Sequence, residues 1–449
     1  MPSGNASVSG PILSYADVVS RVIPAVVTVR SARRVHAPQQ FPFFDDPFFR
    51  QFFGGGMPRG GGTTVERALG SGVIVRSDGY ILTNHHVIDG AEDIRVDLSN
   101  RSSYSAKLVG SDPPSDLAVL KIDANQLSEL HLGNSDQVRV GDICLAVGNP
   151  LAIGESVTAG IISGKGRSTE AGSGSFQDFL QTDAPINQGN SGGALVNTRA
   201  ELIGINSQIL SSNGGNIGIG FAIPSNMARH VMEQLISKGQ VRRGMLGVGI
   251  QEMTSDLASS MGMSEVRGVL VRSVTSGGPA ARAGIQPGDV ILALNGKATN
   301  DENDLRNEIA AMAPGTAVTL TIWRNGRQQD IRVTLGELTS ESARSAQQSR
   351  GGGGASMELG ISVVPLSPQL AAQIGVPNNT QGVVVASVDP AGPAAEAGIQ
   401  AGDVIQQVNR KPIKSPAELQ RALASSGNRP PLLLINRGGE TIFVPVPAQ

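Results

Sequence analysis

Short apolar or alternating segments, separated by glycine, asparagine and aspartate, recur through the first half of the chain. They lie at residues 25–32, 70–77, 79–87, 93–99, 116–122, 143–148, 194–209 and 217–224. Segments of this length and pattern are typical of β-strands. The region from Ser14 to about Pro224 is therefore predicted to form an all-β barrel or a pair of barrels.

One helix is predicted directly after these strands, in residues 224–240. Its apolar positions fall on one face and are Met227, Val231, Leu235 and Ile236. Ser225 has the side chain of an N-cap, and Gly239 suits the position just after the last turn.

The second half of the chain contains an internal repeat. A segment of 32 residues that starts at Gly268 is identical at 19 positions to the segment that starts at Gly382, with an offset of 114 residues. Similarity at this level indicates two copies of one small domain. The residues between the copies are polar and glycine-rich, which is typical of a flexible linker.

These patterns divide the chain into five parts. We expect a flexible N-terminus at 1–13, a β-rich domain at 14–240 with a long loop at about 37–68, a first repeated module at 241–336, the linker at 337–356 and a second module at 357–449.

Composition argues against several classes of function. With 36 basic and 38 acidic residues, the formal net charge of −2 favours neither nucleic acid nor an anionic membrane, and the basic run at 30–36 suits a solvated face. No apolar run approaches the length of a membrane span. The first residues lack the regions of a secretion signal, as expected where such a signal has been removed. The single cysteine, Cys144, allows no disulfide within the chain and lies in an apolar run, which suits a buried thiol.

The segment NQGNSGGALVN, residues 187–197, places Ser191 among glycines. A serine hydroxyl becomes a nucleophile when a base takes its proton and N–H groups stabilise the oxyanion. The amides of Gly189 and Ser191, together with that of Asn190, are the candidate donors. An ordinary glycine-rich turn stays open as the alternative. A phosphate loop is disfavoured because G-x-x-x-x-G-K-[ST] does not occur.

A base and an acid are needed to complete this chemistry. His85 and His86 adjoin in GYILTNHHVIDGA, and Asp116 opens an apolar strand in PPSDLAVLKI. Taken alone, such an aspartate is most often a strand-edge or turn residue. His131 and His230 have no partner pattern and are interpreted as structural. Neither HExxH nor a Cys/His ligand set occurs, so a zinc site is not expected.

The order histidine, aspartate, serine, carried by TNHHV, SDLAVLKI and GNSGG, resembles that of the chymotrypsin-like serine proteases. Together with the repeat and the segment GINSQILSSNGGNIGIGFAIPSNM, it resembles the HtrA (DegP/DegQ) family of bacterial quality-control proteases over nearly the whole chain. The resemblance implies a mainly β fold, with a chymotrypsin-like double β-barrel followed by two PDZ domains. The family pattern T-N-x-H-V selects His86 over His85 as the base, with Asp116 as the acid and Ser191 as the nucleophile.

The resemblance also indicates a specificity pocket. Residues that line the S1 pocket in the family correspond to Ile186 and Ile209, with Leu210 nearby. Branched aliphatic walls would favour small apolar P1 residues such as valine, isoleucine or alanine. The alternative, in which these side chains only fill the barrel core, stays open.

Each repeated module resembles a PDZ domain, in which the amides of an x-L-G-Φ loop (Φ is apolar) receive a peptide C-terminus and a sheet edge accepts the extended chain. The loop residues are Met245, Leu246, Gly247 and Val248 in the first module and Glu358, Leu359, Gly360 and Ile361 in the second. A role in oligomer contacts alone is the alternative, and it is stronger for the second module.

Seven of the 11 phenylalanines lie between Phe41 and Phe53, beside a glycine run. Prolines and aspartates interrupt this segment, so it suits neither a regular strand nor a helix. The resemblance implies a loop that reaches a neighbouring subunit and holds its active-site loops, at about 164–179 and 207–216, in an inactive arrangement. Packing of the phenylalanines on their own barrel is the alternative.

The resemblance implies an ATP-independent serine endopeptidase that acts on unfolded or misfolded proteins in the bacterial periplasm and binds C-terminal peptides. It implies no cofactor and no metal. It also implies a homo-oligomer, with trimers and larger assemblies such as a hexamer, 12-mer or 24-mer. A chaperone or peptide-binding assembly with minor proteolysis is the alternative. A PDZ-only scaffold is weaker because it leaves three protease motifs unexplained.

Overall fold

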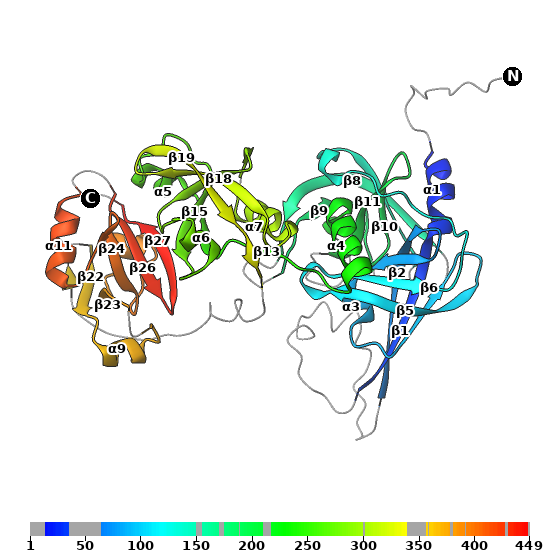
Figure 1. Ribbon diagram of the computed structural model, residues 1–449, viewed down its shortest axis with the longest axis horizontal. Helices are drawn as coiled ribbons and strands as arrows, with labels where there is room; N and C mark the ends of the chain where they lie inside the picture. The colour runs from blue at the N-terminus through cyan, green and yellow to red at the C-terminus, as the bar shows by residue number, and fades with distance from the viewer. Residues whose placement is uncertain are drawn as a thin grey trace. The chain divides into compact units, whose positions relative to one another are not determined.

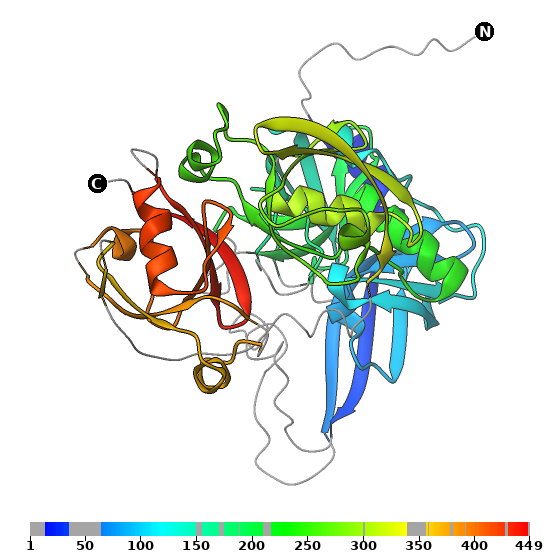
Figure 2. The ribbon, with the colours of Figure 1, turned by 60° about the vertical axis from the view of Figure 1, so that its left-hand side comes forward.

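The computed structural model describes residues 14–35, 64–149, 155–169, 175–187, 189–209, 217–299, 301–338, 356–357, 359–377, 380–390, 392–426 and 430–447. The chain forms two compact units, Met1–Val241 and Arg242–Gln449. Figures 1 and 2 show it from two directions. The phenylalanine-rich segment 41–53, Leu210 and Glu358 lie outside the described residues.

Two closed six-stranded barrels make up most of the first unit, which confirms the predicted mainly β double barrel. Their strand orders are β1-β2-β3-β6-β5-β4 and β10-β11-β12-β9-β8-β7. Closure leaves neither barrel with an unpaired edge strand. The first barrel consists of β1 (Val26–Val35), β2 (Thr64–Arg76), β3 (Tyr80–Thr83), β4 (Asp93–Asp97), β5 (Ser103–Asp112) and β6 (Leu117–Ile122). The second consists of β7 (Ile143–Gly148), β8 (Ser156–Arg167), β9 (Phe179–Thr182), β10 (Ala194–Asn197), β11 (Leu202–Ile209) and β12 (Gly220–Pro224).

The predicted helix is α4 (Ser225–Lys238), and it packs against β5 and β6 of the first barrel and β11 and β12 of the second (Figure 1). Val231 and Leu235 are buried, as the periodicity predicts, while Met227 and Ile236 are partly buried against the same core. Gly239 ends the helix in a left-handed conformation with φ 70°. Ser225 is the first helical residue, and Pro224 occupies the N-cap position instead.

The other helical segments among the described residues of this unit are short. They are α1 (Ala16–Val22), η1 (Ile23–Ala25), α3 (His85–Ile88), η3 (Pro113–Ser115) and η4 (Ser135–Gln137). The sequence pattern predicts a strand through residue 87, but β3 ends at Thr83 and α3 follows. The last residue pair between β3 and β6 is Thr83 with Ala118. Ala118 is the second residue of β6, so only Leu117 remains for β3 to pair with beyond this point. This early turn places His86 close to the start of β6.

The second unit contains two copies of a twisted sheet with short helices. The first copy has the order β14-β15-β16-β18-β19, with β17 on β16 and a separate β13–β20 pair. The second has the order β21-β22-β23-β24-β26-β27, with β25 on β24. In Figure 2, α11 of the second copy, orange-red, lies beside its own sheet.

The elements of the first copy are β13 (Gly244–Met245), β14 (Val248–Glu252), α5 (Ser255–Ser260), β15 (Val269–Val274), α6 (Pro279–Arg282), β16 (Val290–Leu294), β17 (Lys297–Ala298), α7 (Glu302–Ala311), β18 (Ala317–Arg324), β19 (Arg327–Thr334) and β20 (Gly336–Glu337). Those of the second are β21 (Ser356–Met357), β22 (Ile361–Pro365), α9 (Pro368–Gln373), β23 (Val383–Val388), α10 (Pro393–Glu396), β24 (Val404–Val408), β25 (Lys411–Pro412), α11 (Pro416–Ala424), β26 (Leu432–Arg437) and β27 (Glu440–Pro445).

The internal repeat is visible in a buried ion pair that both copies share. Arg324 holds Asp289 through two hydrogen bonds of 2.6 Å, and Arg437 holds Asp403 through two of 2.7 Å. Each aspartate is 1% exposed. The fork of the guanidinium matches the carboxylate, and a buried charge requires such a partner.

Candidate active site

His86 lies in α3, where its imidazole contacts the carboxylate of Asp116. The Nδ1 atom of His86 is 2.8 Å from Oδ2 and 3.0 Å from Oδ1 of Asp116. The main-chain N–H of His86 also donates to Oδ1 at 3.0 Å. The two side chains are 15% and 28% exposed. These contacts orient the ring so that Nδ1 faces Asp116 and Nε2 lies on the other side of the ring.

Asp116 follows η3 and immediately precedes β6. Its backbone is left-handed, with φ 54° and ψ 40°, a conformation that aspartate tolerates better than most residues. Its carbonyl accepts from the N–H of His85 at 3.1 Å and from the side-chain amide of Asn84 at 3.0 Å. The carboxylate of Asp112 caps the preceding turn by accepting from the N–H and the hydroxyl of Ser115. Together these contacts hold a strained residue in one orientation.

The carboxyl group of Asp116 is held in its ionised form. Burial by itself raises its pKa, but attraction to His86 and hydrogen bonds from His86 and Ser207 outweigh burial, so the pKa lies below its ordinary value of 3.8. The hydroxyl of Ser207 donates to Oδ2 of Asp116 at 3.0 Å. The acid therefore stays charged throughout the neutral and mildly acidic range.

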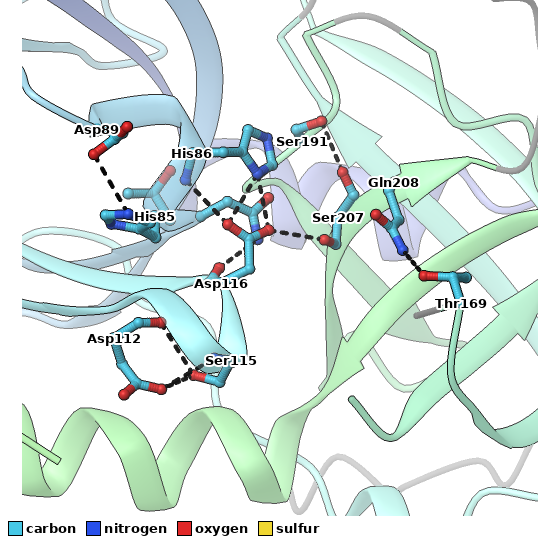
Figure 3. A network of polar contacts seen from close by, with 12 residues as sticks. His85, His86, Asp89, Asp112, Ser115, Asp116, Thr169, Ser191, Ser207 and Gln208 are labelled. Carbon is cyan, nitrogen blue, oxygen red and sulfur yellow. Dashed lines mark hydrogen bonds and ion pairs between the residues drawn. The ribbon is translucent and has the colours of Figure 1, made fainter. Parts of the chain in front are cut away.

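Ser191 is connected to this pair through Ser207. Ser191 is 5% exposed, and its hydroxyl donates to the carbonyl of Ser207 at 3.0 Å. Figure 3 shows Ser191 on the side of the His86 ring that is opposite Asp116. The structure thus brings the three predicted residues together, with His86 and Asp116 supplied by the first barrel and Ser191 by the turn before β10 of the second.

The N–H groups of the turn differ in their partners. The N–H of Asn190 donates to the carbonyl of Asn187 at 3.0 Å, which removes Asn190 from the predicted oxyanion donors. Within the described residues, the N–H groups of Gly189 and Ser191 have no hydrogen-bond acceptor. These two groups therefore remain as the candidate donors.

Gly192 shows why glycine follows the serine. Its φ is 82°, and a Cβ atom there would lie 2.1 Å from the carbonyl oxygen of Ser71 and 2.5 Å from the hydroxyl of Thr83. No side chain fits at these distances, and the backbone conformation itself favours glycine. The first barrel therefore contacts the turn directly.

The other histidines are placed differently. The Nε2 atom of His85 is 3.5 Å from Oδ1 of Asp89, and Figure 3 shows this pair apart from the contact between His86 and Asp116. His230 on α4 pairs with Gln234 at 2.9 Å. His131 is exposed.

The residues predicted for the S1 pocket lie in the core of the second barrel. Ile186 is 2% exposed and Ile209 is 7% exposed, and both belong to the same buried apolar cluster. Ile186 also approaches Gly220, where a Cβ atom would lie 2.9 Å from its Cδ1 atom. Both side chains therefore fill the barrel core, which is the alternative that the sequence left open.

The predicted peptide-binding loop of the first module connects β13 to β14. Met245 ends β13, Leu246 is buried, Gly247 has a φ of 76° and Val248 begins β14. The carbonyls of Leu246 and Gly247 each accept a main-chain N–H at 2.9 Å from the segment around α6. Both carbonyls are thus bound within the module. Because a trans peptide directs its N–H opposite to its carbonyl, the N–H groups of Gly247 and Val248 face away from the segment around α6.

The loop of the second module repeats this geometry. Leu359 is buried, Gly360 has a φ of 73° and Ile361 begins β22. The carbonyl of Leu359 accepts from Ala394 at 3.1 Å, and that of Gly360 accepts from Asp389 at 2.6 Å. The edges of the two sheets differ, because β14 is an edge strand whereas β22 lies between β21 and β23.

Cys144 is buried in the second barrel, where its sulfur lies 3.1 Å from the hydroxyl of Thr182. Burial raises the pKa of this thiol to about 11, which suits a structural residue. In the described part of the chain, no three His, Cys, Asp or Glu side chains form a metal-binding group. No helix among these residues has both the length and the apolar character needed to cross a bilayer.

Two serines that contact the candidate catalytic residues were not predicted from the sequence: Ser207 contacts Asp116, and Ser71 contacts Ser191. Ser207 and Ser71 both lie on barrel strands, and both are buried. The only signal for Ser207 is a run of three polar residues, Asn206 to Gln208, near the end of strand β11. For Ser71 the signal is a serine between two glycines at 70–72.

Family models match three parts of the chain. Residues 70–205 match the trypsin-like peptidase domain. Residues 244–335 and residues 384–437 each match a PDZ domain.

Relatives match nearly the whole chain. A probable periplasmic serine endoprotease, DegP-like, of Chlamydia trachomatis is 43% identical over 406 residues, which are 90% of this chain and 80% of the relative. The periplasmic pH-dependent serine endoprotease DegQ of Escherichia coli is 40% identical over 445 residues, covering 98% of this chain and 93% of its own.

Two solved structures have a similar fold. The HtrA-type protease AlgW with a tripeptide is 43% identical, with a TM-score of 0.59, and the match covers 73% of this chain and 98% of that one. The same protease with a decapeptide is 46% identical, with a TM-score of 0.58 and coverage of 73% and 99%.

Proposed function

The chain belongs to the HtrA family of trypsin-like serine endoproteases, and from this premise we propose that it cleaves peptide bonds with Ser191 as the nucleophile. His86 accepts the proton of Ser191 through Nε2 and later returns it to the leaving amine. Asp116 holds the imidazole and stabilises the imidazolium without becoming protonated. The contact of 2.8 Å between His86 and Asp116 is the observation that supports this proposal most strongly.

The developing oxyanion would be received by the N–H groups of Gly189 and Ser191. In the structure, the hydroxyl of Ser191 donates to the carbonyl of Ser207. Attack on a substrate requires this hydroxyl to donate to Nε2 of His86 instead. A rotation of the Ser191 side chain is thus part of the proposed reaction.

Covalent labelling tests the proposed nucleophile. A fluorophosphonate is expected to add to the full-length protein, and peptide mapping should place the added mass on Ser191. The Ser191→Ala variant, which lacks only the hydroxyl, serves as the matched control and should remain unlabelled. Labelling at another residue, or none in the wild type, would contradict the assignment.

The proposed substrates are unfolded or misfolded proteins, because no nucleotide-binding motif is present to drive unfolding. A small aliphatic P1 residue is proposed from the family resemblance, in which the positions of Ile186 and Ile209 border the S1 pocket, while both side chains are themselves buried in the core of the second barrel. A periplasmic location is proposed because the relatives are named periplasmic endoproteases. The proposed domains are the protease domain at residues 14–240 and the PDZ domains at residues 241–336 and 357–449.

The first PDZ module is proposed to bind C-terminal peptides. Its edge strand β14 can accept an added strand, and the amides of the loop at 245–248 suit a terminal carboxylate. The HtrA-type structures that hold a tripeptide and a decapeptide are consistent with this mode. The second module has the same loop, but β21 already pairs with β22, so we propose that it acts mainly in assembly.

A chaperone or peptide-binding assembly with minor proteolysis is the second candidate. The two PDZ modules favour it, because PDZ domains as a class bind extended peptides without cleaving them. Casein degradation by the wild type, compared with suppression of aggregation by Ser191→Ala, separates the two functions. Slow casein loss together with full suppression would favour the chaperone.

Assembly is proposed to proceed through trimers to larger homo-oligomers, with the segment 41–53 as a regulatory contact. This proposal rests on its seven phenylalanines and on the family resemblance. Deletion of residues 41–53 is expected to reduce the mass of the assembly and to raise the basal peptidase rate. Light scattering and a peptide assay measure the two effects, and a deletion that changes neither would contradict the role.

A further inference from the structure

Ser71 of β2 is a fully buried serine whose polar groups all have partners. Its hydroxyl donates to the carbonyl of Gly189 at 2.6 Å and accepts from the N–H of Asn149 at 2.9 Å. Its N–H donates to the carbonyl of Ser191 at 2.8 Å, and its carbonyl accepts from the hydroxyl of Thr83 at 2.7 Å. Its exposure is 0%.

Two of these hydrogen bonds join the first barrel to the turn that carries Ser191. They reach the carbonyls of Gly189 and Ser191, which lie on either side of Asn190. Gly189 has a φ of 94° and no side chain, so its peptide planes rotate at little cost unless a contact fixes them. Ser71 is therefore placed to fix both ends of the segment 189–191.

We propose that Ser71 is a positioning residue for the oxyanion hole. Its hydroxyl fixes the peptide plane between Gly189 and Asn190, which connects the two candidate donors, and its N–H fixes the carbonyl of Ser191. Held at these two points, the turn keeps the conformation that presents the N–H groups of Gly189 and Ser191. Such donors act efficiently when they are already oriented before the oxyanion forms. Ser71 acts through Gly189 and does not touch the substrate. The inference rests on the proposed serine endopeptidase function.

The Ser71→Ala variant isolates the hydroxyl. The main-chain bond to Ser191 and the bond from Thr83 do not need the side chain, so both can persist in the variant. The carbonyl of Gly189 and the N–H of Asn149 each lose their hydrogen bond to this side chain, and the unpaired buried carbonyl of Gly189 is an unfavourable state. The turn is then expected to sample orientations in which the N–H of Gly189 points away from the oxyanion.

Steady-state kinetics of the full-length protein on a peptide with a small aliphatic P1 residue provide the test. Removal of one oxyanion donor lowers kcat by roughly 10²–10³-fold. Loosening such a donor should cost less, so Ser71→Ala is expected to lower kcat by about 10–100-fold with KM within about threefold. The affinity of a peptide aldehyde, whose hemiacetal oxygen occupies the oxyanion site, should fall by a similar factor.

Two further variants separate positioning from packing. Ser225 is also fully buried, and its hydroxyl donates to the carbonyl of Gly133 at 2.9 Å, so Ser225→Ala loses a similar bond elsewhere. Its kcat should stay within about threefold of the wild type. Ser71→Cys fills the site with a somewhat larger thiol that is only a weak donor, so most of the loss in kcat should persist.

Each other outcome overturns the proposal. A kcat within threefold of the wild type for Ser71→Ala would show that the hydroxyl does not position the turn. An equal loss in Ser225→Ala, recovery in Ser71→Cys, or unchanged aldehyde affinity would assign Ser71 to packing alone. Failure of the wild type to react with a fluorophosphonate at Ser191 would instead reject the proposed function itself.

Discussion

Replacement of His86 by alanine is expected to lower kcat/KM by about 10⁴-fold, whereas replacement of the adjacent His85 leaves it within about threefold. His86 contacts both oxygens of Asp116, at 2.8 and 3.0 Å, as a base oriented by an acid requires. His85 instead approaches Asp89 at 3.5 Å. A peptide assay on the two purified variants, with Ser191→Ala as the background rate, measures the difference.

The two histidine variants control for each other. Both positions lie in α3, both side chains are partly buried, and both replacements remove the same atoms. The contact of His85 with Asp89 is long, at 3.5 Å, and the side chain of Asp89 is 48% exposed, so loss of this contact should alter stability by less than about 1 kcal/mol. If activity is lost on replacing His85 and kept on replacing His86, the assignment of the base is wrong.

Much of the fold could be predicted because its strands carry a local signal. In β6 and β7, consecutive apolar residues are buried on both faces, and such runs are recognisable from sequence alone. β5 and β8 were missed because they expose many of their residues and contain polar and glycine positions. Their pairing is set by neighbouring strands, which are distant in sequence, so tertiary contacts decide these strands.

The candidate site could be predicted only as far as its chemistry has a sequence motif. His86, Asp116 and Ser191 each lie in a short recognisable segment, and the structure places them together. Ser207 and Ser71 contact residues that are 91 and 118 positions away in sequence, and no local pattern encodes such contacts. The loss of Asn190 as a donor likewise depends on how the turn closes on Asn187, and the residue types of the turn do not encode that conformation.

Replacement of Asp116 by asparagine is expected to lower kcat by roughly 10³–10⁴-fold while the fold is retained. Asparagine has the same shape and also tolerates the left-handed backbone of this position. Its amide N–H₂, however, would take the place of Oδ1 or Oδ2, and both of these atoms contact Nδ1 of His86. When it faces His86, Nδ1 must accept and Nε2 carries the proton, so the ring cannot accept the proton of Ser191.

The kinetic control for Asp116→Asn is Ser207→Ala, which removes one hydrogen bond from the carboxylate but leaves its charge and its contact with His86. This variant should lose far less activity, about tenfold or less, because the orientation of the imidazole is retained. Equal losses in the two variants would assign the effect to disruption of the network rather than to the charge of Asp116. Circular dichroism verifies that both variants are folded.

The low pKa of Asp116 also predicts how the asparagine variant differs in stability with pH. A carboxyl group whose pKa is lower in the folded state than in the unfolded chain stabilises the fold above its unfolded pKa, and loses that effect as pH falls through the folded pKa. In a Ser191→Ala background, which prevents self-digestion, Asp116→Asn should therefore lower the free energy of unfolding most at neutral pH. The difference should shrink only as the pH falls below about 3.8, the ordinary value. Urea unfolding between pH 7 and pH 3 measures it, and a difference that grows on acidification would show that the carboxylate is not stabilised by its neighbours.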